Sequence, residues 1–345
     1  RLQREHGLPH ATANRSLQFY QALSDQLFHA SPNIVLSYAQ QLEGITYKPS
    51  ALIQDFAETE IYSPLEKTLT TQASCETYPA EGLALSQLKI KGGTGAFRSQ
   101  AACPFQGYAS FRLQANNIPE TYFGLNAMDR GSITHKALEL IWESLQSSKQ
   151  LDSIESESLN QLIANSIHTA LQSYPISNAI KSLEKTRLQS LLLDWLNLEK
   201  SREHFTIKSL EQSKATIINS LKLTIRADRI DTLSDGSSMV IDYKTKKVTV
   251  TDWQKERLPE PQLPIYALAD ETIRTIAFAQ VRRDKQMLVD SNKLDWAEQK
   301  NIWEMELNQL ATEIQSGYAA VTPRDKLCCQ HCDFQSLCRI HEVTE

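Results

Sequence analysis

Residues 239–245 read MVIDYKT, an apolar run that is interrupted by an aspartate and then reaches a lysine. Side chains alternate between the two faces of a strand, so Asp242 and Lys244 share one face and Tyr243 lies on the other. The apolar residues before Asp242 predict a buried strand, where an unpaired charge is costly. The charged pair therefore indicates chemistry, with a surface ion pair on a strand face as the alternative.

A second strand with acidic residues precedes this one. Residues 216–233 (TIINSLKLTIRADRIDTL) and 237–248 (SSMVIDYKTKKV) alternate with the period of strands, and the Asp-Gly pair at 235–236 is typical of a hairpin turn. A hairpin centred there pairs positions whose numbers sum to about 470, which places Asp228 opposite Asp242. We expect two carboxylates and a lysine on one patch.

These three side chains suit the cleavage of a phosphodiester. Two neighbouring carboxylates repel each other unless a cation lies between them, and a hard divalent ion with oxygen ligands is the natural occupant. Such an ion polarises a phosphoryl group and lowers the pKa of a bound water. Lys244 would hold the attacking water or offset charge on a phosphate oxygen. A patch of surface ion pairs on the hairpin is the alternative.

The composition is that of a globular protein of 345 residues, with 41% hydrophobic and 22% charged residues. The net charge is −5, so any affinity for nucleic acid must come from local basic clusters. Basic residues cluster at 244–247, 255–257 and 282–285. For each cluster, a solvated surface and a DNA contact are the two alternatives. No apolar run predicts a membrane span or a signal peptide, and we expect a cytoplasmic protein, with this chain as a piece of a longer one.

Strand and helix patterns alternate over most of the chain, which predicts an α/β fold. The stretch 128–145 (MDRGSITHKALELIWESL) has apolar residues at helical spacing, with His135 and Glu139 on one face. Further helices are expected at 156–173, 178–201 and 294–317, and a further strand at 272–283.

The order of these motifs resembles the PD-(D/E)XK nuclease superfamily, specifically its RecB-like branch. There the first carboxylate lies in a stretch like RADRID (226–231) and the second in one like VIDYKT (240–245). A helical histidine precedes both, as in RGSITHKALE (130–139), and a Gln-x-x-x-Tyr motif follows, as in QLPIY (262–266). One departure is Ile225, where the family often has glycine. The resemblance implies a central mixed sheet flanked by helices.

The resemblance also implies roles for individual residues. The side-chain ligands of Mg²⁺ or Mn²⁺ would be His135, Asp228 and Asp242. The carbonyl of Tyr243 would be a further ligand, and Lys244 the catalytic lysine. Gln262 and Tyr266 would support the site or contact DNA. A polar helix residue bonded to water is the alternative for His135, and Glu139 is expected to be a surface charge or a supporting partner.

Cysteines gather at the end of the chain, where four of the six lie in the last eighteen residues. Cys329, Cys332 and Cys338 would make a four-thiolate site with one more cysteine, for which Cys103 is the candidate. The arrangement resembles the iron–sulfur staple of AddB-type and CRISPR-associated RecB-like nucleases, which implies a 4Fe–4S cluster. A zinc ion would use the same ligands, and Cys328 is an alternative to Cys329.

The expected organisation has three parts. Residues 1–55 resemble the tail of the helicase-like portion of AddB-type subunits, on the stretches HGLPH, VLSY and KPSALIQDF. Residues 56–95 would be a linker. Residues 96–345 would be a RecB-like nuclease domain, closed by Cys103 and Cys329–Cys338.

The resemblance implies a metal-dependent DNA exonuclease domain of a recombination and repair protein of the helicase–nuclease type. It would act on DNA ends or single strands, with a helicase partner subunit and no membrane. One alternative is a DNA-binding module with a silent nuclease site and an iron–sulfur or zinc staple. Another is a zinc-stabilised interaction domain. The intact Asp228, Asp242 and Lys244 favour the enzyme.

Overall fold

The computed structural model describes residues 2–5, 7–8, 10–42, 44–56, 81–85, 90–115, 124–330 and 332–340. The chain divides into two compact units. The first comprises Arg1–Thr77 with Asn178–Leu183, and the second comprises Tyr78–Ser177 with Glu184–Glu345. Most of the expected linker lies outside the described residues, so the domain boundaries at 55 and 95 stay predictions.

The described N-terminal residues of the first unit form the helices α1 (Leu2–Glu5) and α2 (Ala13–Phe28). The Thr12 side chain caps α2 by accepting a hydrogen bond from the backbone of Arg15. A short antiparallel pair follows, β1 (Gln41–Leu42) with β2 (Ile45–Thr46). Every α2 side chain is at least partly exposed, so this helix has no buried face of its own.

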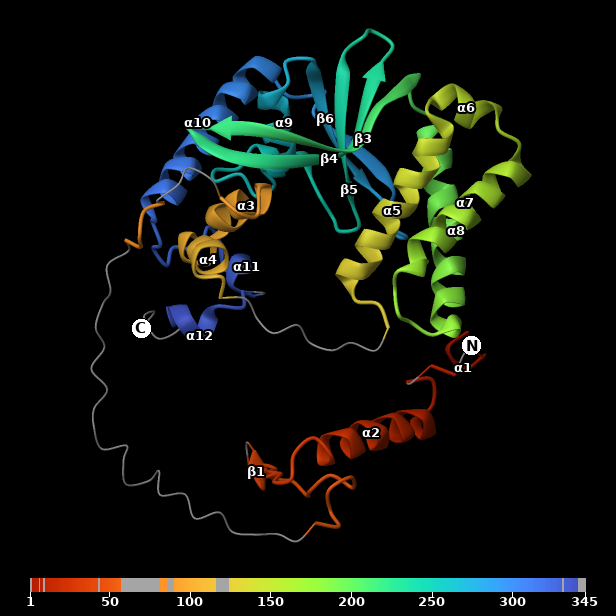
Figure 1. Cartoon of the computed structure of the whole chain (residues 1–345), viewed down its shortest axis with the longest axis vertical. Coiled ribbons are helices and arrows are strands. Elements are labelled where there is room, and N and C mark those ends of the chain that lie inside the picture. Colours follow the sequence, from red (N-terminus) through yellow and green to blue (C-terminus); the bar gives the residue numbers. More distant parts are fainter. Residues whose placement is uncertain are drawn as a thin grey trace. The chain divides into compact units, whose positions relative to one another are not determined.

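A five-stranded sheet forms the centre of the second unit (Figure 1). Its strands lie in chain order: β3 (Phe205–Ile218), β4 (Leu221–Leu233), β5 (Ser238–Lys244), β6 (Ile273–Gln280) and β7 (Met287–Asp290). Only β5 and β6 pair in parallel, and the other pairs are antiparallel. The strand with MVIDYKT is central and buried from Ser238 to Tyr243. The predicted mixed sheet is confirmed.

The prediction of one strand over 216–233 is wrong, because the chain reverses inside it. Asn219 and Ser220 have φ values of 44° and 68°, the left-handed pair that a two-residue hairpin turn requires. The predicted second turn is confirmed. Gly236 has φ 83°, and Asp235 Oδ1 accepts hydrogen bonds from the backbone N–H and the hydroxyl of Ser237.

Helices cover both faces of the sheet (Figure 1). One face packs against α5 (Ala127–Leu145), α7 (Ser156–Gln172) and the part of α8 (Asn178–Glu199) from Glu184 on. The other packs against α3 (Thr94–Ala102), α9 (Gln262–Ala269) and α10 (Trp296–Ser316). Shorter elements complete the unit: α4 (Pro104–Tyr108), η2 (Ala109–Leu113), α6 (Ser148–Ser153) and η3 (Val250–Trp253). The expected flanking helices are confirmed.

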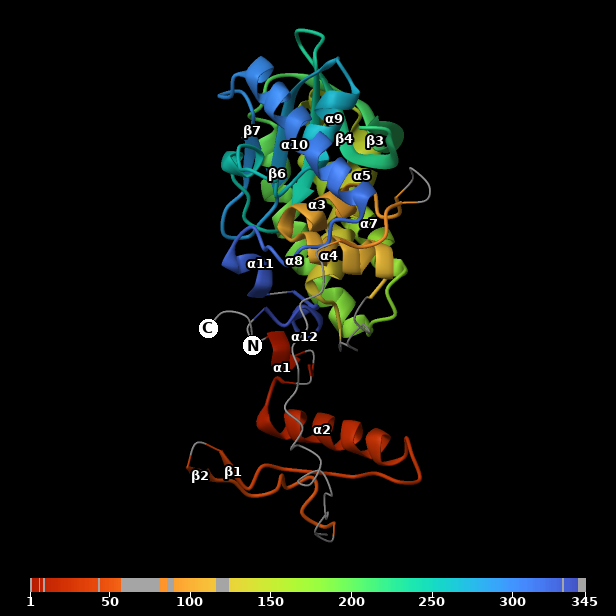
Figure 2. The ribbon, with the colours of Figure 1, turned by 90° about the vertical axis from the view of Figure 1, so that its left-hand side faces the viewer.

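The C-terminal segment returns to the beginning of this unit. Arg324 N donates to Ala102 O at 2.8 Å, and Phe105 N donates to Ala320 O at 3.0 Å. Two short helices follow, α11 (Lys326–Gln330) and α12 (Gln335–Cys338), and Figure 2 shows them close to α4. This return places the last cysteines near Cys103.

Candidate active site

The register of β4 and β5 agrees with the predicted hairpin pairing, in which the numbers of paired residues sum to about 470. Arg229 pairs with Ile241 and Ile230 with Val240, so the next positions in the same register are Asp228 and Asp242. The backbone N–H of Tyr243 donates a hydrogen bond of 2.8 Å to Asp228 Oδ2. Both carboxylates are buried, so the site lies at the end of the β4–β5 ladder and not on the surface of a hairpin.

Helix α5 brings His135 to this carboxylate. Its start is fixed by a capping box, in which Asn126 and Asp129 exchange side-chain and backbone hydrogen bonds. Two turns on, His135 Nδ1 lies 3.3 Å from Asp228 Oδ2. Glu139, which shares this helix face, is partly buried and forms an ion pair with Lys136 at 2.8 Å.

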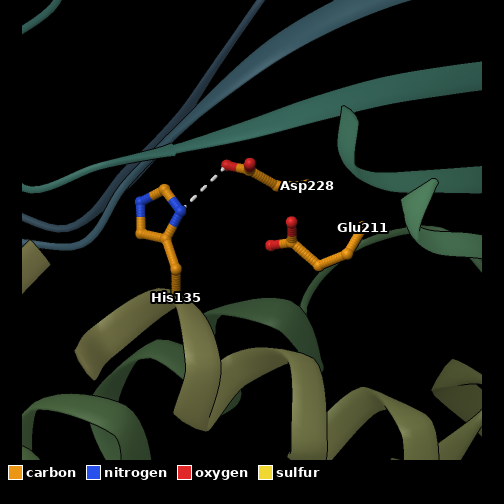
Figure 3. A group of neighbouring side chains, drawn as sticks. All are labelled: His135, Glu211 and Asp228. Atoms are coloured by element: carbon orange, nitrogen blue, oxygen red, sulfur yellow. Dashed lines mark ion pairs between the residues drawn. The ribbon is translucent and has the colours of Figure 1, made fainter. Parts of the chain in front are cut away.

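Glu211 is a third member of this group, which sequence reasoning missed. The β3–β4 register places it opposite Asp228, because its neighbours Leu210 and Gln212 pair with Arg229 and Ala227. One ligand atom each from His135, Glu211 and Asp228 lie within 4.8 Å of one another. Figure 3 shows the imidazole from α5 and the two carboxylates from the sheet turned toward a common point.

The backbone at Glu211 is strained. Its φ is 46°, in the left-handed region that a glutamate rarely adopts, and such strain is concentrated at functional sites. Arg226 Nε lies 2.8 Å from Glu211 Oε2. The sequence carried no signal for this residue, because the strand that holds it was not predicted as separate.

Lys244 lies between two carboxylates. Its Nζ is 2.7 Å from Asp242 Oδ2 and 3.3 Å from Glu260 Oε2. Glu260 also pairs with Lys246 at 2.5 Å and with Arg98 at 3.9 Å. Sequence reasoning missed Glu260, which is buried 18 residues away in the chain from Asp242 and has no recognisable motif around it.

The site perturbs the acid–base properties of its members. Burial, reinforced by the negative charge of Asp228, raises the pKa of Asp242 to about 6 although Lys244 opposes the shift. Burial alone would lower the pKa of His135, but its hydrogen bond and attraction to Asp228 outweigh that effect and raise it. Burial and the charge of Asp228 also raise the pKa of Glu211.

The pKa of Lys244 is raised by the same balance of burial and charge as that of His135. Burial would lower its pKa, but the charges of Asp242 and Glu260 outweigh burial and raise it. Its carboxylate partners therefore favour the protonated, hydrogen-bond-donating form of Lys244. This state suits the stabilisation of negative charge on a phosphate oxygen better than the removal of a proton from water.

The Gln-x-x-x-Tyr motif lies on α9 and holds the strand backbones. Gln262 Nε2 donates to Arg226 O at 3.1 Å, and Tyr266 Oη donates to Gln212 O at 2.9 Å. These carbonyls lie two residues from Asp228 and one from Glu211. Tyr266 is buried and Gln262 is partly exposed, and both hydrogen bonds reach the backbone next to a carboxylate of the site.

A buried ionic network lies beneath the site. Arg229, which is fully buried, forms two hydrogen bonds of 2.6 and 2.7 Å with Asp231 and two of 2.9 and 3.4 Å with Glu199. It also donates a hydrogen bond of 3.2 Å to the Tyr243 hydroxyl. Its guanidinium carbon lies 4.1 Å from the centre of the Trp142 ring, in a cation–π contact. By alternation, Arg229 and Asp231 point away from the face of Asp228. Sequence reasoning assigned them no role.

The predicted cysteine set meets in space. One small cavity is lined by Cys103, Cys328, Cys329, Cys332 and Cys338. Burial and the charges of the neighbouring thiols raise the pKa of Cys329. Cys328 differs from the others because its Sγ accepts a hydrogen bond of 3.5 Å from Arg324. Cys75 and His331 lie outside the described residues.

The residues present fit both inorganic groups. An imidazole and two carboxylates within 4.8 Å suit a divalent ion, and thiols around one cavity suit an iron–sulfur cluster or zinc. Asp242 Oδ2 and Glu211 Oε2 are buried and accept no well-directed hydrogen bond within the described part of the chain, although each has an ion pair. Such oxygens have lone pairs free for a cation.

Comparisons with known proteins match the same region. The sequence model of the PD-(D/E)XK nuclease superfamily matches residues 95–339. The chain is 26% identical over 233 residues to a subunit of the ATP-dependent helicase/deoxyribonuclease of Staphylococcus saprophyticus, a match that covers 61% of this chain and 19% of that protein. The chain thus spans about a fifth of the length of this relative. The solved structure of SSO0001 is 18% identical, with a TM-score of 0.27, over 71% of this chain and 95% of that one.

In the described part of the chain, every helix is too short or too polar to cross a bilayer.

Proposed function

Since this chain belongs to the PD-(D/E)XK nuclease superfamily, we propose that the site at His135, Asp228, Asp242 and Lys244 hydrolyses phosphodiester bonds of DNA with Mg²⁺ or Mn²⁺. The resemblance inferred from the sequence motifs is confirmed at the level of this superfamily. The observation that carries the proposal is the convergence of His135, Glu211 and Asp228 beside the Asp242–Lys244 pair. The raised pKa values of His135, Glu211 and Asp242 around this point support the proposal, because perturbed pKa values cluster at functional sites.

The proposed ligands come from separate elements. His135 from α5, Asp228 from β4 and Asp242 from β5 would hold the ion, with Glu211 from β3 as a fourth side chain and the Tyr243 carbonyl as a further oxygen. When bound, the ion would supply Lewis acidity at the phosphoryl group and lower the pKa of water.

The protein side chains would do the remaining work. Lys244, kept protonated by Asp242 and Glu260, would donate a hydrogen bond to a phosphate oxygen on which negative charge grows. Gln262 and Tyr266 would keep β3 and β4 in place through their backbone carbonyls. The network of Arg229 would hold Tyr243, and hence the strand between Asp242 and Lys244, from the opposite face.

We further propose that the chain acts on DNA ends or single strands, as an exonuclease that works with a helicase partner. The support is the name of the relative, which describes a helicase and deoxyribonuclease, together with the sequence motifs of the RecB-like branch. Residues 1–55 would then be the tail of a helicase-like domain, and residues 96–345 the nuclease domain.

We propose a 4Fe–4S cluster as the occupant of the cysteine cavity, held by Cys103, Cys329, Cys332 and Cys338. It would tie the start of the nuclease domain to its end. Protein purified without oxygen should then contain about four iron and four sulfide per chain and show a broad visible absorbance band. Cys332→Ser should abolish the band and Cys328→Ser should retain it. A colourless protein with one zinc per chain would contradict the cluster.

The proposed activity is tested with end-labelled single-stranded DNA and Mg²⁺ or Mn²⁺. The wild type should cleave, and Asp228→Asn should lose nearly all cleavage, because this change neutralises a proposed ligand and keeps its size. Single-nucleotide products that appear first from one end would identify an exonuclease. Absence of cleavage in folded, cofactor-loaded protein would favour a DNA-binding module with a silent site.

A further inference from the structure

Four arginines surround a pocket beside the proposed active site. This arginine pocket has a volume of about 280 Å³, and its polar lining includes Arg130, Arg187, Arg282, Arg283, Thr134 and Thr245. Two of these arginines belong to the 282–285 cluster, which the sequence left open between a solvated face and a DNA contact. The structure gives this cluster a concave setting together with two helical arginines.

A buried carboxylate holds two of the arginines of this pocket in place. The side chain of Glu184 is 3% exposed and pairs with Arg130 Nε at 3.1 Å and with Arg187 Nε at 2.6 Å. A guanidinium has five N–H donors, so each arginine keeps further donors for a ligand. Arg282 is paired with Asp284, an exposed carboxylate that also lines the pocket, through hydrogen bonds of 2.9 and 2.5 Å. Two carboxylates thus pair with three arginines, and with Arg283 the lining keeps an excess of positive charge.

Two lining residues of the arginine pocket are direct sequence neighbours of proposed catalytic or metal-binding residues. Thr245 follows Lys244 directly, and Thr134 precedes His135. The Val281 amide, from another lining residue, donates to the Lys244 carbonyl at 2.9 Å. A group bound in the pocket therefore lies beside the strand end that carries the catalytic lysine.

A second cationic pocket lies near Lys244. This lysine pocket has a volume of about 310 Å³, and its basic lining residues are Arg98, Lys246, Lys247 and Arg324. Its wall includes Glu260, which also pairs with Lys244 at 3.3 Å. Thr245 thus lines the arginine pocket, and the next residue, Lys246, lines the lysine pocket. The two pockets share no lining residue and both adjoin the strand end at Lys244.

We propose that the arginine pocket and the lysine pocket bind backbone phosphates of one DNA strand on either side of the bond to be cleaved. This inference rests on the proposed function. Guanidinium groups match the geometry of phosphate oxygens, and arginine and lysine contacts to phosphates carry no sequence information. With a net charge of −5, the chain depends on such local patches to attract a polyanion. Two pockets flanking one lysine suit a continuous strand better than a free phosphate.

The test measures binding of a short fluorescent oligonucleotide of mixed sequence across a series of KCl concentrations, with divalent ions chelated. Three double variants of the full chain are compared with wild type: Arg282→Gln/Arg283→Gln, Lys246→Gln/Lys247→Gln and the control Lys222→Gln/Arg274→Gln. The control removes the same charge from exposed positions outside both pockets. Thermal melting verifies that each variant is folded, and Arg283→Gln alone replaces the first double variant if that variant does not fold.

Each pocket variant should bind roughly tenfold more weakly, and the slope of log Kd against log salt should fall by about 0.7 for each phosphate that the variant no longer binds. The control should keep the wild-type slope. Strands with and without a 5′-phosphate should lose affinity equally, because the pockets are assigned to internal phosphates. Wild-type slopes in both pocket variants, no binding by the wild type, or a loss confined to 5′-phosphorylated strands would each overturn the proposal.

Binding without divalent ions also separates this proposal from the proposed function. Protein that binds DNA through both pockets but cleaves none would support the pockets and refute the nuclease. Protein that cleaves DNA, with pocket variants that bind like the wild type, would refute the pockets and leave the nuclease site in place.

Discussion

The backbone amide of Tyr243 donates a 2.8 Å hydrogen bond to Oδ2 of Asp228. This bond joins the two strands of the site just beyond the last pair of their ladder, Arg229 with Ile241. It places one carboxylate against the strand that carries the other, with Asp242 and Lys244 on either side of the donor. The Asp228 carboxylate is thus held against the backbone of β5, next to the residue that carries the other carboxylate.

Glu211 should contribute to metal affinity, because its carboxylate lies within 4.8 Å of the ligand atoms of His135 and Asp228. In Glu211→Gln, Mn²⁺ should bind at least tenfold more weakly, since a roughly tenfold loss is common even for residues that only support a ligand. Electron paramagnetic resonance of free Mn²⁺ during a titration measures this. Glu143→Gln, an exposed change of equal charge on α5, is the control, and equal affinities of both variants would remove Glu211 from the site.

Arg229 should be the most costly arginine to remove. Arg229→Met would leave Glu199 and Asp231 buried with Arg202 as their remaining cation, which should lower the free energy of unfolding by about 3 kcal/mol or more. Arg274→Met, at an exposed position of β6, should change it by less than about 0.5 kcal/mol. Urea unfolding followed by tryptophan fluorescence measures both.

The tryptophan signal suits this comparison, because all five tryptophans belong to the second unit. Similar unfolding midpoints for the two variants would mean that the network contributes little. They would also mean that Tyr243 is held by packing alone.

The same network predicts sensitivity to acid. Burial would raise the pKa of Glu199, but the charges of Arg229 and Arg202 outweigh it and lower the pKa below its ordinary value of about 4.3. The unfolded chain therefore binds more protons in this range. The contribution of Glu199 to stability is complete above that ordinary value and is lost as the pH falls through the lower, folded value.

Urea midpoints measured from neutral pH down to about pH 3 test this sign. The wild type should lose stability as the pH falls below about 4.3, and Glu199→Gln should be less stable at neutral pH but lose less on acidification. Parallel pH profiles for the two proteins would contradict the assignment of this titration to Glu199.

Local patterns were sufficient to predict the centre of the fold. The Asp-Gly turn at 235–236 fixed a register that the structure reproduces, because a tight hairpin turn leaves little freedom of pairing. The turn at Asn219–Ser220 escaped prediction because neither residue is a glycine and the period of two continues across it. Missing this turn concealed β3, and with it Glu211.

Local sequence patterns could not predict contacts between segments that are far apart in the chain. Glu260 and the Glu199–Arg229 pair have no signature, since their roles come from burial next to partners far away in the chain. The meeting of Cys103 with the C-terminal cysteines was inferred from resemblance and not from spacing. The structure brings these thiols to one cavity, and their ligation of a cluster stays a proposal.

The central claim is that MVIDYKT is a catalytic strand, and Lys244→Ala tests it most directly. Cleavage of end-labelled single-stranded DNA with Mg²⁺ or Mn²⁺ should fall by roughly 100-fold or more, as on the loss of one preorganised donor to a developing anion. The control Lys293→Ala, at an exposed position outside both pockets, should cleave like the wild type. Equal cleavage by Lys244→Ala and the wild type would place the activity elsewhere and contradict the account.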